Sequence, residues 1–186
     1  MTLGELKRKV FALIEELDET KKELTADPDL ATKINDVVCQ VLYELARYKK
    51  IPKYCEIEVH EGDLITFEDI EKEVGYQIYQ VSLFGGVEYE PKANNTMFKI
   101  RADGTAEIDC FVYPEYINHK TKDNFELELS PDCLEIAVFG IAADILKADV
   151  STEYGSIYAS RYESMKQTLD PRHSMNMVTV VGGLYI

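Results

Sequence analysis

The sequence of 186 residues lacks tryptophan, and it lacks the short motifs that usually mark an active site. It has no HExxH motif, no GxSxG elbow and no glycine-rich loop with Walker or GxGxxG spacing. Its three histidines, His60, His119 and His173, are far apart, and no two have the spacing of paired metal ligands. We therefore predict a protein that is not an enzyme and that uses no metal ion or cofactor.

Cysteine is sparse, and its placement argues against disulfides and zinc. Cys39, Cys55, Cys110 and Cys133 form no CxxC pair and lie beside apolar or strand-forming residues. A disulfide framework or a zinc site would need paired or closely spaced cysteines. We expect buried, reduced thiols, which is the usual state of isolated cysteines.

Long apolar runs are missing as well. Nowhere do about 18 apolar residues follow one another, so the sequence predicts no membrane-spanning helix. The first ten residues mix charged side chains such as Glu5 and Arg8 with apolar ones, unlike the continuous apolar core of a signal peptide. The sequence therefore predicts a soluble protein, located in the cytoplasm where it is made.

Positive charge is scarce, and the deficit is uneven along the chain. Residues 51–129 carry 17 acidic and 7 basic side chains, a net charge of −10 within a total of −14. Binding of nucleic acid requires lysine and arginine to neutralise phosphates, so this balance argues against sequence-specific binding of DNA or RNA. An acidic surface is still compatible with DNA that slides past without sticking.

Apolar residues at helical spacing predict helices near both ends of the chain. The predicted helices cover residues 3–24, 28–48, 131–148 and 153–169. Thr2 and Glu5 form a capping box at the start of the first helix. The third is apolar nearly all round and is expected to be central, since such a helix has no face suited to water.

Between these helices the pattern changes to strand-forming residues in alternation, separated by glycine and asparagine turns. The predicted strands cover residues 54–59, 64–70, 76–84, 86–90, 96–101, 105–113 and 125–129. Residues 72–75 interrupt the pattern as a loop or a helical turn. We predict an antiparallel β subdomain of five or six strands.

The predicted fold class is therefore α+β. A helical bundle core is formed by both chain ends, with an inserted antiparallel β subdomain and an extended C-terminal arm. The expected parts are an N-terminal helical hairpin (1–50), the β subdomain (51–129), the C-terminal helices that complete the bundle (130–170) and the arm (171–186).

Acidic side chains and tyrosines gather in the β subdomain and leave two alternatives open. Eight carboxylates crowd one region and could act as general acid and base or bind calcium, although a solvated strand face explains them more simply: they are Glu56, Glu58, Glu61, Asp63, Glu68, Asp69, Glu71 and Glu73. Five tyrosines could form an aromatic platform in a non-enzymatic module that binds glycans or a host surface; they are Tyr76, Tyr79, Tyr89, Tyr113 and Tyr116. Equally, tyrosines serve as half-buried strand residues or interface contacts.

The C-terminal arm is apolar and nearly uncharged, which is an aggregation hazard unless something covers it. It could pair with its own β subdomain, or with a neighbouring subunit or partner by strand addition. The candidate interface residues are Val178, Val180, Val181, Leu184, Tyr185 and Ile186 of the arm and Tyr154, Tyr158 and Tyr162 of the last helix.

Several weak motifs occur together in a fixed order. A helical hairpin ends in LYELAR (42–47), and strands read GVEYE (86–90) and GTAEI (104–108) through VYPEYI (112–117). LELSPD (127–132) precedes the helix FGIAADIL (139–146), and YASRYE (158–163) lies on the last helix. In this order the sequence resembles the head–tail adaptor (connector) proteins of tailed bacteriophages, although its β insertion is larger than that of the smallest adaptors.

The resemblance implies a structural role in the virion neck, with assembly in the host cytoplasm. Such proteins form a ring, usually of twelve subunits, below the portal protein and line a channel for DNA. The implied partners are further copies of the chain, the portal and a downstream tail or stopper protein, with no membrane. A stopper or a tail accessory protein is the alternative within the same group.

Overall fold

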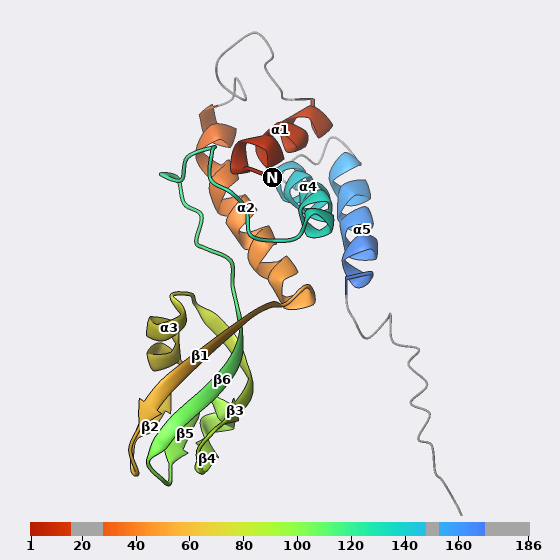
Figure 1. Cartoon of the computed structure of the whole chain (residues 1–186). Helices are drawn as coiled ribbons and strands as arrows, with labels where there is room; N and C mark the ends of the chain where they lie inside the picture. Colours follow the sequence, from red (N-terminus) through yellow and green to blue (C-terminus); the bar gives the residue numbers. More distant parts are fainter. Residues whose placement is uncertain (16–27, 148–152, 170–186) are drawn as a thin grey trace, which may run out of the picture.

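The computed structural model describes residues 1–15, 28–147 and 153–169. It combines α-helices with antiparallel sheets, which confirms the α+β class. The predicted arm (171–186) lies outside the described residues, as do residues 16–24 of the first predicted helix. In Figure 1 the helices of both chain ends lie at one end of the molecule and the strands at the other.

Helices from the beginning and the end of the chain share one hydrophobic core. They are α1 (Leu3–Leu13), α2 (Pro28–Tyr48), α4 (Pro131–Leu146) and α5 (Tyr154–Gln167). As predicted, α4 is central: it contacts α1, α2 and α5. Its side chains from Cys133 to Ala142 are mostly buried, including Leu134 and Ile141. Burial on several sides explains why this helix carries no polar face.

The first helix begins where the sequence predicts and ends earlier. The Thr2 hydroxyl accepts a hydrogen bond from the Glu5 N–H at 3.2 Å, and the Glu5 carboxylate accepts one from the Thr2 N–H at 2.8 Å. The capping box is therefore confirmed. The helix ends at Leu13 because Glu15 has a left-handed backbone, with a φ of 61°. The expected continuation of the helix through residues 14 and 15 was wrong.

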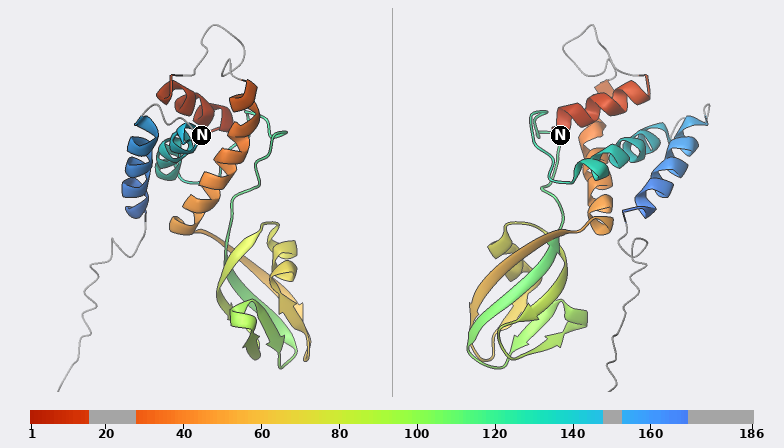
Figure 2. Two further views of the ribbon diagram at one scale, coloured as in Figure 1. Left: turned by 180° about the vertical axis from the view of Figure 1, so that it is seen from behind. Right: turned by 45° about the vertical axis from the view of Figure 1, so that its right-hand side comes forward.

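Within the described residues, six strands form two three-stranded antiparallel sheets, ordered β1-β6-β3 and β2-β5-β4. The strands are β1 (Ile51–Val59), β2 (Leu64–Thr66), β3 (Ile78–Gly85), β4 (Tyr89–Lys92), β5 (Met97–Ile100) and β6 (Gly104–Val112). A second hydrophobic core, separate from the helical one, contains buried side chains from both sheets, such as Ile108, Phe84 and Phe98. Figure 2 shows the strands grouped together with α3, away from α1, α2, α4 and α5.

The predicted strand over residues 64–70 was wrong in its second half, where helix α3 (Phe67–Val74) begins instead. The Asp69 carboxylate accepts hydrogen bonds from the Thr66 N–H at 3.0 Å and the Thr66 hydroxyl at 2.7 Å. This local cap satisfies donors at the start of the helix. Ile70 is the fully buried residue of α3, and the partly buried Phe67 and Val74 also pack against the β core.

The predicted strand over residues 125–129 was also wrong. This segment makes a single bridge, between Thr2 and Glu126, and continues as an irregular connection to α4. Leu127 and Leu129 are buried in the helical core. Their alternation therefore reflects packing against helices, which produces the same pattern as a half-buried strand.

Candidate functional site

Helix α5 exposes large apolar side chains on its outer surface. The residues Tyr154 and Ile157 are 59% and 52% exposed, respectively. The Tyr154 ring stacks on Tyr158 with a centroid distance of 6.4 Å, and the half-buried Tyr158 donates a hydrogen bond to the Leu13 carbonyl at 3.2 Å. We call Tyr154, Ile157 and the exposed edge of Tyr158 the α5 patch. It is an apolar surface at the terminal helix, of the kind used in protein contacts.

Tyr162, the third predicted interface tyrosine on α5, lies inside the fold. It is 6% exposed, and its hydroxyl donates to a Glu44 carboxylate oxygen on α2 at 3.0 Å. A Cβ added at Gly140 of α4 would lie 2.8 Å from the Tyr162 ring, so only glycine allows this approach. The structure thus uses Tyr162 to hold α5 against α2 and α4. Of the three tyrosines predicted on this helix, Tyr154 is exposed and Tyr158 is half-buried.

A buried lysine joins the same contact. Lys166 is 3% exposed and its ammonium pairs with the carboxylates of Glu44 and Glu163. It also lies 4.7 Å from the ring centroid of Tyr162 and 5.2 Å from that of Tyr48. Burial works to lower the pKa of Lys166, but the hydrogen bonds to Glu163 and Glu44 outweigh it, and the pKa is raised. These contacts hold one face of α5, while the α5 patch is free on another.

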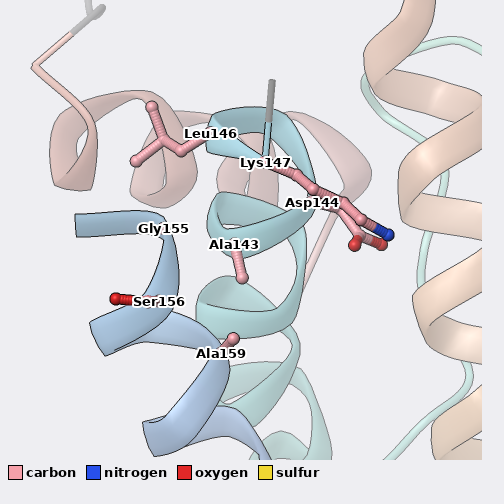
Figure 3. A pocket seen from close by; sticks show the side chains of 7 residues that line it. All are labelled: Ala143, Asp144, Leu146, Lys147, Gly155, Ser156 and Ala159. Carbon is pink, nitrogen blue, oxygen red and sulfur yellow. The ribbon is translucent and has the colours of Figure 1, made fainter. Parts of the chain in front are cut away.

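A hollow of about 390 Å³ lies between the end of α4 and the start of α5 (Figure 3). Its lining residues are Ala143, Asp144, Leu146, Lys147, Gly155, Ser156 and Ala159. Asp144 and Lys147 project to one side in Figure 3 and Ser156 to the other, so these polar groups do not converge. A catalytic site would need them to meet at one point.

In the described residues, the histidines and carboxylates are spread over the surface or used in local contacts. His60 and His119 are exposed and His173 lies outside the described residues. Asp63 and Asp69 are used as local caps, since Asp63 accepts a hydrogen bond from the His60 N–H at 2.8 Å. Within residues 1–15, 28–147 and 153–169, no three His, Cys, Asp or Glu side chains are placed to hold a metal ion. The acid–base and calcium alternatives gain no support.

The five tyrosines of the β subdomain do not form one platform. Tyr79 and Tyr113 are packed at the junction with α2, and Tyr89 packs against the β core. Tyr76 donates to a glutamate after β6, and Tyr116 alone is strongly exposed, at 63%. Tyr79 and Tyr113 pack on each other, whereas Tyr76 and Tyr89 lie elsewhere and Tyr116 projects outward. The five rings therefore do not form one exposed platform, and the glycan-binding alternative gains no support from them.

The sequence did not predict the aromatic junction between the two cores. The rings of Tyr43 on α2 and Tyr113 after β6 stack at 4.6 Å, and Tyr79 on β3 packs on Tyr113 at 4.9 Å. The Arg47 Nε donates to the Tyr113 hydroxyl at 3.0 Å, and the Tyr79 hydroxyl donates to the Ala46 carbonyl at 2.8 Å. Burial raises the pKa of Tyr43 and of Tyr79 to about 12. The junction ties the β strands to α2.

The cysteines are free thiols, as expected. Cys39, Cys110 and Cys133 are buried, and Cys55 is half-buried rather than buried. Burial raises the pKa of Cys110 to about 11 and that of Cys39 above its usual value. A thiol with a raised pKa is a poor nucleophile near neutral pH, so these side chains serve packing.

Comparison with known proteins adds no relative to this description. The sequence matches no protein-family model and no curated protein. Among the helices of the described chain, none has the length and apolar character needed to cross a membrane.

Proposed function

We propose that this protein is a structural head–tail adaptor of a tailed-phage neck, which forms a ring below the portal, joins head to tail and lines the DNA channel. The proposal includes the finer architecture expected from the sequence, a helical bundle made by both chain ends with an inserted β subdomain and a C-terminal arm. It also includes a virion location, with assembly in the host cytoplasm. Its partners are other copies of the chain in a ring of about twelve, the portal, and a downstream tail or stopper protein.

The observation that carries the proposal is the two-sided character of α5. Tyr162 and Lys166 fix one side of the helix to α2 and α4, while Tyr154 and Ile157 remain exposed on another. A rigid terminal helix with an exposed apolar patch is suited to contact a neighbouring subunit. The chain continues from this helix into residues 174–186, which contain no charged side chain.

The charge balance supports passage of DNA without retention. The net charge is −14, and residues 51–129 contribute most of it. Phosphates gain little from such a surface because few cations are available to replace their counterions. A channel protein needs this property, because tight binding would stop the DNA as it moves.

The test is native mass spectrometry of the purified chain, alone and mixed with the portal protein of the same genome. We expect a ring, or about one adaptor subunit bound per portal chain, for the wild type. The double variant Tyr154→Ser/Ile157→Ser should lose this assembly and keep its circular dichroism spectrum. Tyr116→Ser is the matched control, since it removes an equally exposed aromatic side chain elsewhere.

Truncation after Pro171 examines the arm separately. The fold should survive, because the described core ends at Leu169, and ring formation should weaken. A wild-type chain that stays monomeric and ignores the portal would contradict the adaptor proposal. If the double variant Tyr154→Ser/Ile157→Ser assembles as well as the wild type, the α5 patch is not a contact surface of the ring.

A further inference from the structure

The outer face of the β1-β6-β3 sheet exposes two large apolar side chains in one row. Tyr54 on β1 and Leu83 on β3 are both register partners of Asp109 on β6. They are 54% and 55% exposed, whereas Ile108 and Cys110, the neighbours of Asp109 in β6, are fully buried. Side chains alternate between the faces of a strand, so Asp109 lies on the outer face with Tyr54 and Leu83. β1 and β6 run side by side in Figure 1.

The neighbouring rows of this face carry carboxylates that oppose one another. Glu56 on β1 is paired in register with Glu107 on β6, and Glu58 follows two residues further along β1. All three are exposed. Like charges directly opposite each other on an antiparallel pair destabilise the sheet. The pairing of Glu56 with Glu107 is therefore unfavourable for folding.

The described part of the chain supplies no counter-charge to these groups. No lysine, arginine or histidine in it forms an ion pair with Glu56, Glu58, Glu107 or Asp109. Glu56 accepts a hydrogen bond from the Tyr54 hydroxyl at 2.7 Å, which leaves its charge in place. Lys50 precedes β1, and its ammonium is 4.4 Å from the ring centroid of Phe111, which is paired with Pro52 in the next row.

We propose that this face, formed by Tyr54, Glu56, Glu58, Leu83, Glu107 and Asp109, is a docking surface for a protein partner that presents lysine or arginine side chains around an apolar residue. A cationic partner relieves the repulsion between Glu56 and Glu107, for which the described residues provide no ion pair. Tyr54 and Leu83 supply the apolar contact that excludes water from the centre of the interface.

The charge selects among the possible partners. Nucleic acid and anionic membranes carry the same sign as the four carboxylates and are repelled. A basic protein is attracted, and its association is expected to weaken as salt screens the charges. This surface is on the β strands, away from the α5 patch, so the inference stands whether or not the chain forms a ring.

The test uses a synthetic ten-residue peptide that alternates lysine with leucine, titrated into the full-length protein and followed by amide chemical shifts. We expect shifts along β1, β6 and β3, binding that falls as salt rises, and no binding of a glutamate–leucine peptide. Glu56→Gln/Glu107→Gln should weaken binding about tenfold. Glu68→Gln/Glu73→Gln is the matched control, because it removes two exposed carboxylates from α3 and should bind like the wild type.

Two further measurements separate a docking surface from general attraction of charge. Tyr54→Ser/Leu83→Ser keeps every carboxylate and should still weaken binding, because the apolar contact is lost. Glu56→Gln/Glu107→Gln should also raise the thermal unfolding temperature, since the opposed charges are gone. Equal binding by the face and control variants, unchanged binding by Tyr54→Ser/Leu83→Ser, or a lowered unfolding temperature would overturn the proposal.

Discussion

Contacts between residues that are close in the sequence can be predicted from it. Contacts between residues that are far apart in the sequence depend on the fold and cannot be predicted in the same way. The Thr2–Glu5 capping box was predicted, because both side chains lie within one helical turn. The pairing of Glu44 with Lys166 was not, because these residues are 122 positions apart in the sequence. A buried lysine also contradicts the usual exposure of this residue type, so no pattern indicates it.

The Glu44–Lys166 pair should respond unequally to loss of each partner. Lys166 has a side chain that is 4% exposed, whereas the Glu44 side chain is 43% exposed. Glu44→Leu leaves a buried ammonium with one carboxylate and removes the acceptor of the Tyr162 hydroxyl, so we expect a loss of about 2–3 kcal/mol in the free energy of unfolding. Lys166→Met leaves carboxylates that water can reach, and we expect a loss of about 1 kcal/mol.

Urea denaturation of both variants measures this difference. Lys147→Met, which replaces a lysine outside this pair, is the control and should change stability little. If both variants lose the same free energy of unfolding, or if Lys166→Met loses more than Glu44→Leu, then burial of the Lys166 ammonium does not determine the loss of stability.

At the scale of elements, periodicity predicted the strongly patterned segments and failed where two patterns fit the same residues. The helices α2, α4 and α5 carry apolar residues at helical spacing over many turns, and their predicted extents match closely. The short helix α3 has fewer turns in which to show a period, and Ile65 and Phe67 are two residues apart, as in a strand. The Thr66–Asp69 cap decides in favour of the helix, because it satisfies backbone donors that a strand would have to pair elsewhere.

The cap of α3 should make its stability depend on pH. Hydrogen bonds from the Thr66 side chain and backbone lower the pKa of Asp69 below its ordinary value of 3.8. A lowered folded-state pKa contributes stability that is present above the unfolded value and is lost as the pH falls through the folded value. We therefore expect Asp69→Asn to lower the free energy of unfolding by about 1 kcal/mol near pH 7.

The difference in the free energy of unfolding between the wild type and Asp69→Asn should become smaller below about pH 4, because the wild-type carboxyl then gains its proton. Thermal unfolding at a series of pH values measures it, and amide exchange in α3 reports the same effect locally. Glu68→Gln is the control on the same helix, without a capping contact. A difference that stays constant down to pH 2 would contradict the role of the carboxylate charge.

At the scale of the molecule, the described residues form two hydrophobic cores, and the aromatic junction of Tyr43, Tyr79 and Tyr113 connects the helices with the strands. Composition and periodicity predicted the helical and β parts separately. They could not predict the junction, because Tyr43, Tyr79 and Tyr113 come from three distant segments and each fits a half-buried helix or strand position. The same limit applies to the α5 patch, whose exposure depends on which face α4 covers.

The junction should make the two cores unfold together. Tyr113 contacts Tyr43, Tyr79 and Arg47, so Tyr113→Ala removes the shared centre of the contact. We expect the free energy of unfolding to fall by about 3–5 kcal/mol. We also expect the single unfolding transition to separate into two, one for each core. Amide signals of Ile108 in the β core and Leu134 in the helical core follow each part during urea denaturation.

Tyr116→Ala is the matched control, because Tyr116 meets Tyr43 only at its ring edge and is 63% exposed. It should leave a single transition for both signals. Separate transitions already in the wild type would mean that the junction does not couple the cores. A single transition in Tyr113→Ala would assign the coupling to the backbone connections instead. Under the adaptor proposal, coupling through Tyr113 would transmit a load on the β strands to the helices that carry the α5 patch.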